Sequence, residues 1–242
     1  MSGHSKWATT KRQKGITDLK RGALFTKLGN IISIASREGG EDSESNFKLR
    51  LAIEKAKQAN MPKENIERAV KRGVGKLEGS KIEEIIYEAF GPDGIPLIIE
   101  VLTDNKNRAV SNIKSILNKH GGSLSGPNSV LWKFKKCGVI RVNKVELSNG
   151  VNLEEFELKL MDLQIEDMEE EDEELVIYTK LEDFQKVKEE LEQQKIKIDY
   201  AEIEWINKEK NNLTNVTEKT KEKMEKIFEE LDDEIDVSNV FY

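Results

Sequence analysis

The side chains best suited to chemistry in this sequence are basic, and they gather near its beginning. Seven of them stand within residues 1–30, where Asp18 is the single acid. They are Lys6, Lys11, Arg12, Lys14, Lys20, Arg21 and Lys27. Each Lys or Arg that neutralises a phosphate releases a condensed counterion, so a nucleic acid is the expected partner of such a segment. Trp7 lies among them and offers a ring that can pack on a sugar or a base.

Composition alone is weak evidence for binding, because Lys and Arg on a helix often form only a solvated face. The clustering favours the binding hypothesis. Gly3, Gly15 and Gly22 are interspersed with the basic residues and would allow another backbone to approach closely. We interpret Phe25 as a core residue rather than a stacking platform.

The charge is divided unevenly along the chain. Residues 1–76 carry 17 Lys and Arg against 8 Asp and Glu, a net charge of +9, although the whole chain has a net charge of -7. The remaining residues carry 22 and 38, a net charge of -16. We therefore expect only the basic head to dock on nucleic acid, because the acidic body would repel a polyanion or meet a different partner.

Metal binding and catalysis find little support in the sequence. His4, His120 and Cys137 are too far apart in the chain to suggest a zinc-type cluster. The acidic run Glu169–Glu174 is interpreted as a solvated turn rather than a cation site. Gly73–Lys76 lacks the spacing of a phosphate-binding loop and follows a helix, which favours an interdomain hinge. The sequence contains no nucleophile elbow and no credible catalytic triad. We therefore expect no enzymatic activity, no metal, no cofactor and no small-molecule substrate.

The compartment is inferred from the cysteine and the apolar runs. Cys137 is the single cysteine, so no internal disulfide can form, and we interpret it as an inert thiol in a reducing cytoplasm. The longest apolar stretch, residues 95–102, is interrupted by Pro96 and Glu100 and falls short of the roughly 18 residues that span a bilayer. No membrane association is expected.

The elements that position the basic residues are predicted to be helical after an extended arm over residues 1–15. Apolar periodicity predicts helices over 18–37 and 46–59, and a third helix after Asn60-Met61-Pro62, with Asn60 as a possible N-cap, ending at Gly73. The side chains expected to face their core are Leu19, Phe25, Leu28, Ile31, Ile32, Ala35, Phe47, Leu51, Ile53, Ala56, Ile66, Ala69 and Val70.

The acidic body begins with a predicted hairpin. Strands are expected over 84–90 and 95–102, on either side of the turn Gly91–Gly94. Further on, Val130, Trp132 and Phe134 alternate with other residues and predict a strand over 129–135.

A helix is predicted between those strands. Asp104 or Asn105 can cap its start, and Gly121-Gly122 ends it after His120. At that end the imidazole would meet the helix dipole favourably, so His120 is interpreted as structural.

The pattern of the remaining elements predicts one domain inserted into another. Strands over 139–142, 164–168, 175–179 and 196–205, with helices over 153–161 and 181–193, follow the β-α-β-β-α-β order of a ferredoxin-like unit. A last helix over 218–231 and strand over 236–241 cannot make a domain alone, and they complete the sheet begun by the hairpin. We therefore predict an α+β protein of three domains: residues 1–76, residues 77–136 plus 207–242, and an inserted acidic domain over 137–206.

Several motifs resemble the YebC/PmpR family, and the match runs in order through nearly the whole chain. They are Gly3-His4-Ser5-Lys6-Trp7-Ala8, Lys20-Arg21-Gly22, Phe25-Thr26-Lys27-Leu28, Arg50-Leu51-Ala52-Ile53, Ala59-Asn60-Met61-Pro62-Lys63, Asn65-Ile66-Glu67-Arg68-Ala69, Tyr87-Glu88, Leu102-Thr103-Asp104-Asn105-Lys106-Asn107-Arg108 and Lys119-His120-Gly121-Gly122. The resemblance implies a helical N-terminal domain and two α/β domains, one inserted in the other. It also implies a probable transcriptional regulator that binds DNA, or, as in some relatives, a translational activator associated with the ribosome.

The sequence departs from this family at a few basic positions. Arg12 stands where many relatives have His, and Ala23 and Asn30 fall where relatives often carry a basic residue. The first helix is therefore expected to make fewer phosphate contacts than usual.

Two main hypotheses remain from the sequence, beside a third in which the chain is an interaction module whose main partner is another protein. The first is a cytoplasmic, DNA-binding regulator of transcription that contacts phosphates through the basic head. The alternative is a ribosome-associated translation factor whose head grips ribosomal RNA while the acidic body meets basic ribosomal proteins. Neither hypothesis identifies base-specific contacts, because phosphate contacts carry no sequence information.

Overall fold

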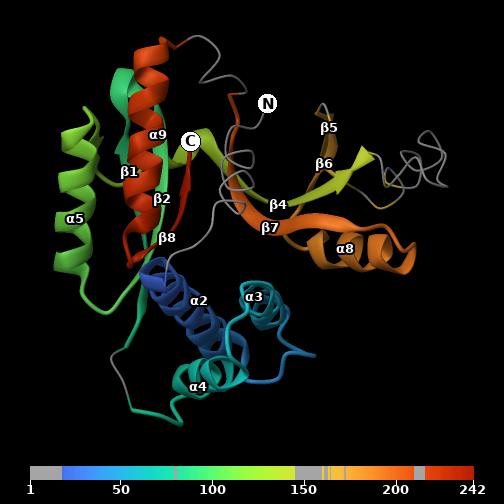
Figure 1. Cartoon of the computed structure of the whole chain (residues 1–242). Coiled ribbons are helices and arrows are strands. Elements are labelled where there is room, and N and C mark those ends of the chain that lie inside the picture. Colours follow the sequence, from blue (N-terminus) through green and yellow to red (C-terminus); the bar gives the residue numbers. More distant parts are fainter. Residues whose placement is uncertain are drawn as a thin grey trace. The chain divides into compact units, whose positions relative to one another are not determined.

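The computed structural model describes residues 18–78, 81–144, 160, 163, 165–171, 173–209 and 216–242 (Figure 1). This part of the chain forms two compact units. One unit holds residues 134–208, and the other combines residues before and after that segment. The segment 134–208 is thus inserted into a unit whose halves lie far apart in sequence.

Three helices form the N-terminal part of the larger unit. They are α2 (Asp18–Gly39), α3 (Phe47–Gln58) and α4 (Lys63–Gly73), close to the predicted ranges. The prediction for Asn60 is wrong: it adopts a left-handed backbone with φ of 58°, and Pro62 occupies the N-cap position of α4. Pro62 has no backbone N–H to leave unsatisfied there.

A buried asparagine fixes the start of α3. The side-chain oxygen of Asn46 accepts the backbone N–H of Leu49 at 3.1 Å, which satisfies a donor that the first helical turn leaves free. Its amide nitrogen donates to the carbonyls of Ala35 and Gly40, each at 2.8 Å. One side chain therefore caps α3 and ties it to the end of α2.

The three helices share one apolar core. Its buried members are Leu28, Ile32, Ala35, Leu49, Ala52, Ala56, Met61, Ile66 and Ala69. Phe47 and Leu51 were expected in this core and are only half-buried, because α3 turns the stripe of Leu49, Ala52 and Ala56 inward instead. Both stripes have helical spacing, so periodicity cannot choose between them; the Phe47 ring instead lies under the guanidinium of Arg50.

Small residues allow α2 and α4 to pack closely. A Cβ placed on Gly73 would lie 1.9 Å from Ser36 Oγ and 2.2 Å from the carbonyl oxygen of Ser33. Arg72, beside it, donates to the Gly29 carbonyl at 3.1 Å. Gly73 therefore serves a helix crossing, which is a packing role and not a phosphate-binding one.

The rest of the larger unit is a four-stranded antiparallel sheet covered by two helices. Its strands lie in the order β3-β1-β2-β8. In chain order its elements are β1 (Glu83–Phe90), η1 (Pro92–Gly94), β2 (Pro96–Thr103), α5 (Lys106–Lys119), β3 (Ser123–Leu124), η2 (Leu131–Lys133), α9 (Glu218–Asp233) and β8 (Val237–Phe241). The hairpin and the last strand thus belong to one sheet, and the last helix packs against it, as the sequence predicted.

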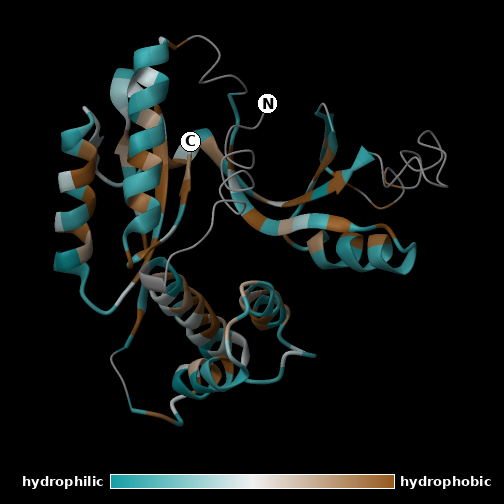
Figure 2. Cartoon of the chain, viewed as in Figure 1, coloured by the Kyte–Doolittle hydropathy of each residue, from teal (hydrophilic) through white to brown (hydrophobic). Residues whose placement is uncertain are grey.

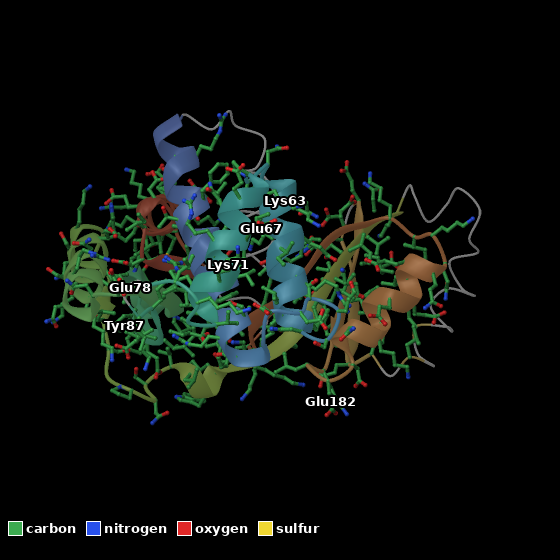
Figure 3. All side chains as sticks on the ribbon, turned by 90° about the horizontal axis from the view of Figure 1, so that it is seen from below. Lys63, Glu67, Lys71, Glu78, Tyr87 and Glu182 are labelled. Carbon is green, nitrogen blue, oxygen red and sulfur yellow. The ribbon has the colours of Figure 1, made fainter. Side chains whose placement is uncertain are left out.

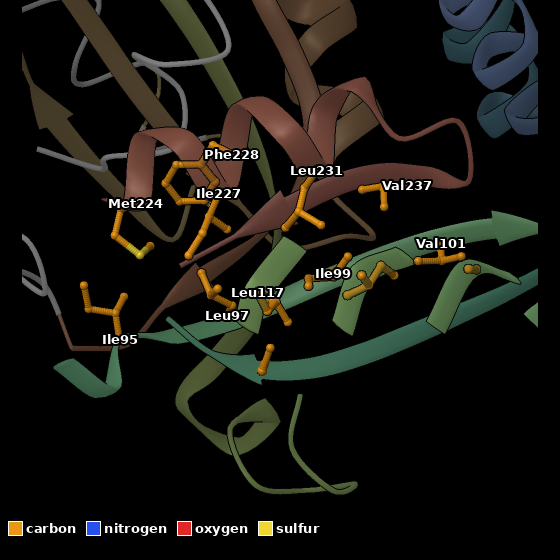
Figure 4. Packing of buried hydrophobic residues seen from close by; sticks show 13 residues of the cluster. Ile95, Leu97, Ile99, Val101, Leu117, Met224, Ile227, Phe228, Leu231 and Val237 are labelled. Carbon is orange, nitrogen blue, oxygen red and sulfur yellow. The ribbon is translucent and has the colours of Figure 1, made fainter. Parts of the chain in front are cut away.

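Both helices pack against the same face of this sheet. The core between them includes Leu97, Ile99 and Val101 of β2 with Leu117 of α5 and Phe228 of α9, all at most 5% exposed (Figure 4). The apolar residues of α5 lie on its side toward α9 and the sheet, and its other side is hydrophilic (Figure 2).

The smaller unit contains a second four-stranded antiparallel sheet, in the order β5-β6-β4-β7. Its elements are β4 (Phe134–Asn143), β5 (Asp167–Glu170), β6 (Glu174–Thr179), α8 (Phe184–Gln193) and β7 (Ile198–Asn207). A Cβ on Gly138 of β4 would lie 2.3 Å from the Phe184 ring, so this glycine lets α8 rest on the sheet.

The structure confirms a mixed α+β chain and corrects one predicted strand. Residues 131–133 form the short helix η2, and β3 at Ser123–Leu124 is the edge strand instead. Phe134, expected to end that strand, begins β4 of the other unit. The helix expected over 153–161 falls largely outside the described residues. The ferredoxin-like assignment and the three domain boundaries therefore stay predictions.

Candidate nucleic-acid interface

The predicted phosphate contacts divide into two groups. Lys6, Trp7, Lys11, Arg12 and Lys14 lie outside the described residues. The other three predicted contacts, Lys20, Arg21 and Lys27, all lie in the first half of α2.

Two of these three residues, Lys20 and Lys27, contact the carboxyl-terminal end of α9. Lys20 Nζ contacts both carboxylate oxygens of Asp233, at 3.0 and 2.9 Å, and this raises the pKa of the Lys20 ammonium. Lys27 donates to the backbone carbonyl of Asp232. The end of a helix carries a partial negative charge, and α9 has no basic residue in its own last turn. Helix α2 therefore supplies the cations that this end needs.

The Lys20 pair remains open to water. The side chain of Lys20 is 55% exposed and that of Asp233 is 50% exposed. Exposed pairs contribute about 0–1 kcal/mol, so a phosphate could replace Asp233 at small cost. Arg21 is also exposed.

Further contacts hold α2 against the sheet of the larger unit. Ile34 of α2 packs with Ile82 and Leu102 in a small apolar cluster. Arg37 Nη1 donates to the Ile82 carbonyl at 2.5 Å. Together with the charged contacts at α9, these contacts join α2 to the sheet domain.

One expectation about α2 is corrected. We expect Asn30, which falls where relatives often carry a basic residue, to leave one phosphate contact unmade, but its side chain is buried, with 9% exposed. Its side-chain oxygen accepts Arg72 Nη2 at 3.0 Å. Because Asn30 faces α4, it adds nothing to the outer surface.

Helices α3 and α4 present basic residues that the sequence analysis missed. Lys57, Arg68 and Lys71 are exposed, and no described carboxylate forms an ion pair with them. Lys63 and Lys71 project from α4 (Figure 3), where Lys63 pairs with Glu67 at 3.7 Å. The signal was available: Arg68 and Lys71 are three residues apart, opposite the buried stripe of α4, and so share its outer face.

The acidic run in the smaller unit is partly structural. Arg141, whose side chain is 1% exposed, places Nη1 3.0 Å from Glu171 and 2.9 Å from Glu174. Burial disfavours its charge, yet the bonds to Glu174 and Glu171 prevail and raise the pKa of the guanidinium. The solvated-turn interpretation is therefore wrong for these two carboxylates, which neutralise a buried cation.

Two of the metal-ligand candidates, His120 and Cys137, lie within the described residues, and His4 lies outside them. In the described ranges, no group of three or more His, Cys, Asp or Glu side chains could hold a metal ion. His120 caps the end of α5 with Nε2 3.0 Å from Glu230 Oε1, in keeping with a structural role. Burial raises the pKa of the Cys137 thiol to about 12, which keeps it protonated and unreactive. No helix in the described part of the chain is long and apolar enough to cross a bilayer.

Comparison with known families matches nearly the whole chain. A model of the TACO1/YebC protein N-terminal domain matches residues 5–76, and a model of the TACO1/YebC second and third domain matches residues 82–242.

Relatives and a solved structure agree with that match. The chain is 45% identical over 242 residues to a probable transcriptional regulatory protein of Thermoanaerobacter pseudethanolicus, covering 100% of this chain and 96% of the relative. It is 44% identical to one of Caldanaerobacter subterraneus, covering 100% and 97%. A crystal structure of a conserved hypothetical protein from Aquifex aeolicus aligns with a TM-score of 0.77 at 39% identity, over 93% of this chain and 90% of that one.

Proposed function

Because the chain belongs to the TACO1/YebC family, we propose that it is a transcriptional regulator that binds DNA through its basic helical domain. The names of its relatives support a regulatory role. The observation that carries the proposal is the outer face of α3 and α4, where Lys57, Arg68 and Lys71 stand exposed without an ion-pair partner among the described residues.

The binding surface has three parts. The first part is the predicted arm over residues 1–15, whose Lys6, Lys11, Arg12 and Lys14 contact phosphates. The outer face of α4 supplies Arg68 and Lys71. The first half of α2 supplies Arg21. It also supplies Lys20 and Lys27, which leave their partners at the end of α9 and bind phosphate instead. Phosphates are the better ligands in low salt, because each contact releases a counterion that the internal pair does not.

Affinity should therefore depend steeply on salt. If about six phosphates of a duplex are neutralised, the logarithm of the binding constant falls with the logarithm of the salt concentration at a slope of roughly -5. The test is a titration of a labelled 20-base-pair duplex followed by fluorescence polarisation. A slope near zero would refute the proposal.

A pair of variants tests the outer face of α4. Arg68→Ala with Lys71→Ala should weaken duplex binding for all sequences alike and flatten the salt slope by about 2. The matched control is Lys114→Ala with Lys219→Ala, which removes two exposed lysines from α5 and α9 of the acidic body. Equal losses in both variants would mean that net charge alone, and not this face, governs binding.

We also propose a cellular compartment for the protein and a fold for its inserted domain. We place the protein in the cytoplasm, and we assign residues 137–206 as a ferredoxin-like domain inserted between the halves of the sheet domain; the strand order β5-β6-β4-β7 supports this. A separate experiment tests the ribosome-associated alternative. Co-sedimentation with ribosomes that survives DNase treatment, without enrichment on DNA, would favour it over transcription.

A further inference from the structure

An exposed tryptophan stands apart from the basic helices. The side chain of Trp132 in η2 is 61% exposed, the largest exposure among the big apolar side chains of the described residues. Its Nε1 donates to the Ser129 carbonyl at 3.2 Å, and Lys133 Nζ lies 5.0 Å from the ring centroid. A tryptophan held in this way contributes its ring to the surface rather than to a core.

A buried carboxylate organises the segment that displays this ring. Glu88 of β1 is 7% exposed. It accepts the backbone N–H groups of Asn128 at 2.6 Å, Val130 at 2.7 Å and Leu131 at 2.8 Å. Burial would raise the pKa of Glu88, but these three bonds prevail and lower it. The carboxylate thus fixes the backbone immediately before Trp132.

Other bonds close the same segment. Ser125 Oγ and Ser129 Oγ lie 2.5 Å apart, and Ser129 Oγ also donates to the Gly126 carbonyl at 2.6 Å. The N–H of Lys133 reaches the Val130 carbonyl at 2.9 Å. Trp132 is therefore presented by a preorganised segment, so little conformational freedom is lost when something binds to the ring.

The chemistry around the ring favours a nucleic-acid base. Residues 123–133 contain one lysine, Lys133, and no acidic residue, inside a body that is otherwise strongly acidic. Glu209 brings one carboxylate, 3.0 Å from Lys133 Nζ. The side chains of this pair are 25% and 59% exposed, so a phosphate can compete for the ammonium while a base stacks on the ring.

We propose that Trp132 is a stacking platform for an unpaired base, with Lys133 contacting the adjoining phosphate. This inference rests on the proposed nucleic-acid binding and adds a second contact on the α/β part of the larger unit. In a duplex the faces of the bases are covered by their neighbours, so the platform serves single strands and opened duplexes.

The test uses the full chain and a fluorescein-labelled 15-nucleotide single strand beside the duplex of the same sequence. Trp132→Ala should weaken binding of the single strand by about 5- to 100-fold and leave duplex binding within about 2-fold, because stacking contributes only where a base is free. Trp132→Phe keeps a ring and should retain most of the affinity. Ile235→Ala, which shortens another exposed apolar side chain of the same unit, is the matched control.

A second readout locates the contact. In protein labelled with 5-fluorotryptophan, the ¹⁹F signal that is missing in Trp132→Ala belongs to Trp132. The single strand should shift this signal and the duplex should not. An unmoved signal at saturating single strand, or equal losses for both nucleic acids, overturns the platform while leaving the proposed DNA binding intact. No binding of either nucleic acid defeats both.

Discussion

The contact between α2 and the end of α9 predicts that the protein's own carboxylates compete with nucleic acid. Replacing Asp232 and Asp233 by Asn removes the carboxylate partner of Lys20 and the negative charge beside Lys27. Both lysines can then meet phosphate without first giving up an internal charge. We expect the double variant to bind a duplex more tightly than the natural chain.

The magnitude follows from exposure and charge. An exposed ion pair such as that of Lys20 with Asp233 contributes about 0.2–1 kcal/mol. In the variant this pair is absent, so it no longer has to be broken before Lys20 binds phosphate. Each deleted charge within about 7 Å of a bound phosphate removes roughly 0.6 kcal/mol of repulsion in water. Together these amount to about 1–2 kcal/mol, or about 5- to 30-fold in affinity at low salt.

The variant should also fold. Two carboxylates at the end of a helix oppose the helix dipole, so changing them to Asn relieves about 0.3–1 kcal/mol each. That gain offsets the loss of the Lys20 pair. Circular dichroism and a urea midpoint close to that of the natural chain would show that altered binding does not come from altered folding.

The matched control changes the same number of charges on the same helix. Glu222 and Glu225 are exposed and lie about 10–16 Å before Asp232 and Asp233, beyond the Debye length of about 10 Å at 0.1 M salt. Glu222→Gln with Glu225→Gln should gain much less affinity in the same polarisation titration, and the advantage of the Asn variant should shrink as salt rises. Equal gains in the two variants, or none in the Asn variant, would contradict the competition.

Two further predictions concern stability. Glu88→Gln should lower the free energy of unfolding by about 2–3 kcal/mol at pH 7, because an amide cannot accept all three N–H bonds that the carboxylate accepts. The folded pKa of Glu88 is lowered, so this contribution is complete above the unfolded carboxyl pKa of about 4.3 and is lost as pH falls through the folded value. The urea midpoints of the two proteins should therefore approach each other as the pH falls below the unfolded value, and meet once it lies below the folded one. Gly73→Ala should destabilise by about 1–3 kcal/mol through the clash with Ser36, whereas Gly22→Ala, with nothing within 4 Å, should stabilise α2 slightly. Thermal unfolding of both Ala variants checks the contrast, and a loss of equal size at Gly22 would count against the helix-crossing argument.

Local signals in the sequence determined most of the elements. The Gly91–Gly94 turn between two apolar runs specifies the β1–β2 hairpin, and Asn105 caps α5 because its side-chain oxygen reaches the N–H of Arg108 at 3.0 Å. These features depend on residues a few positions apart, whose chemistry is visible in the chain itself. The uneven distribution of charge is likewise a property of the sequence.

The tertiary structure alone decided what those charges face. Lys20 and Asp233 are 213 positions apart, and no local pattern reveals that α2 ends up beside the end of α9. Likewise, alternation over 129–135 predicted a strand, but Glu88, 40 to 43 positions away, holds the backbone before Trp132 in another form. Local propensity is worth tenths of a kcal/mol per residue, whereas a buried carboxylate with three donors is worth several times more, so the distant contact prevails.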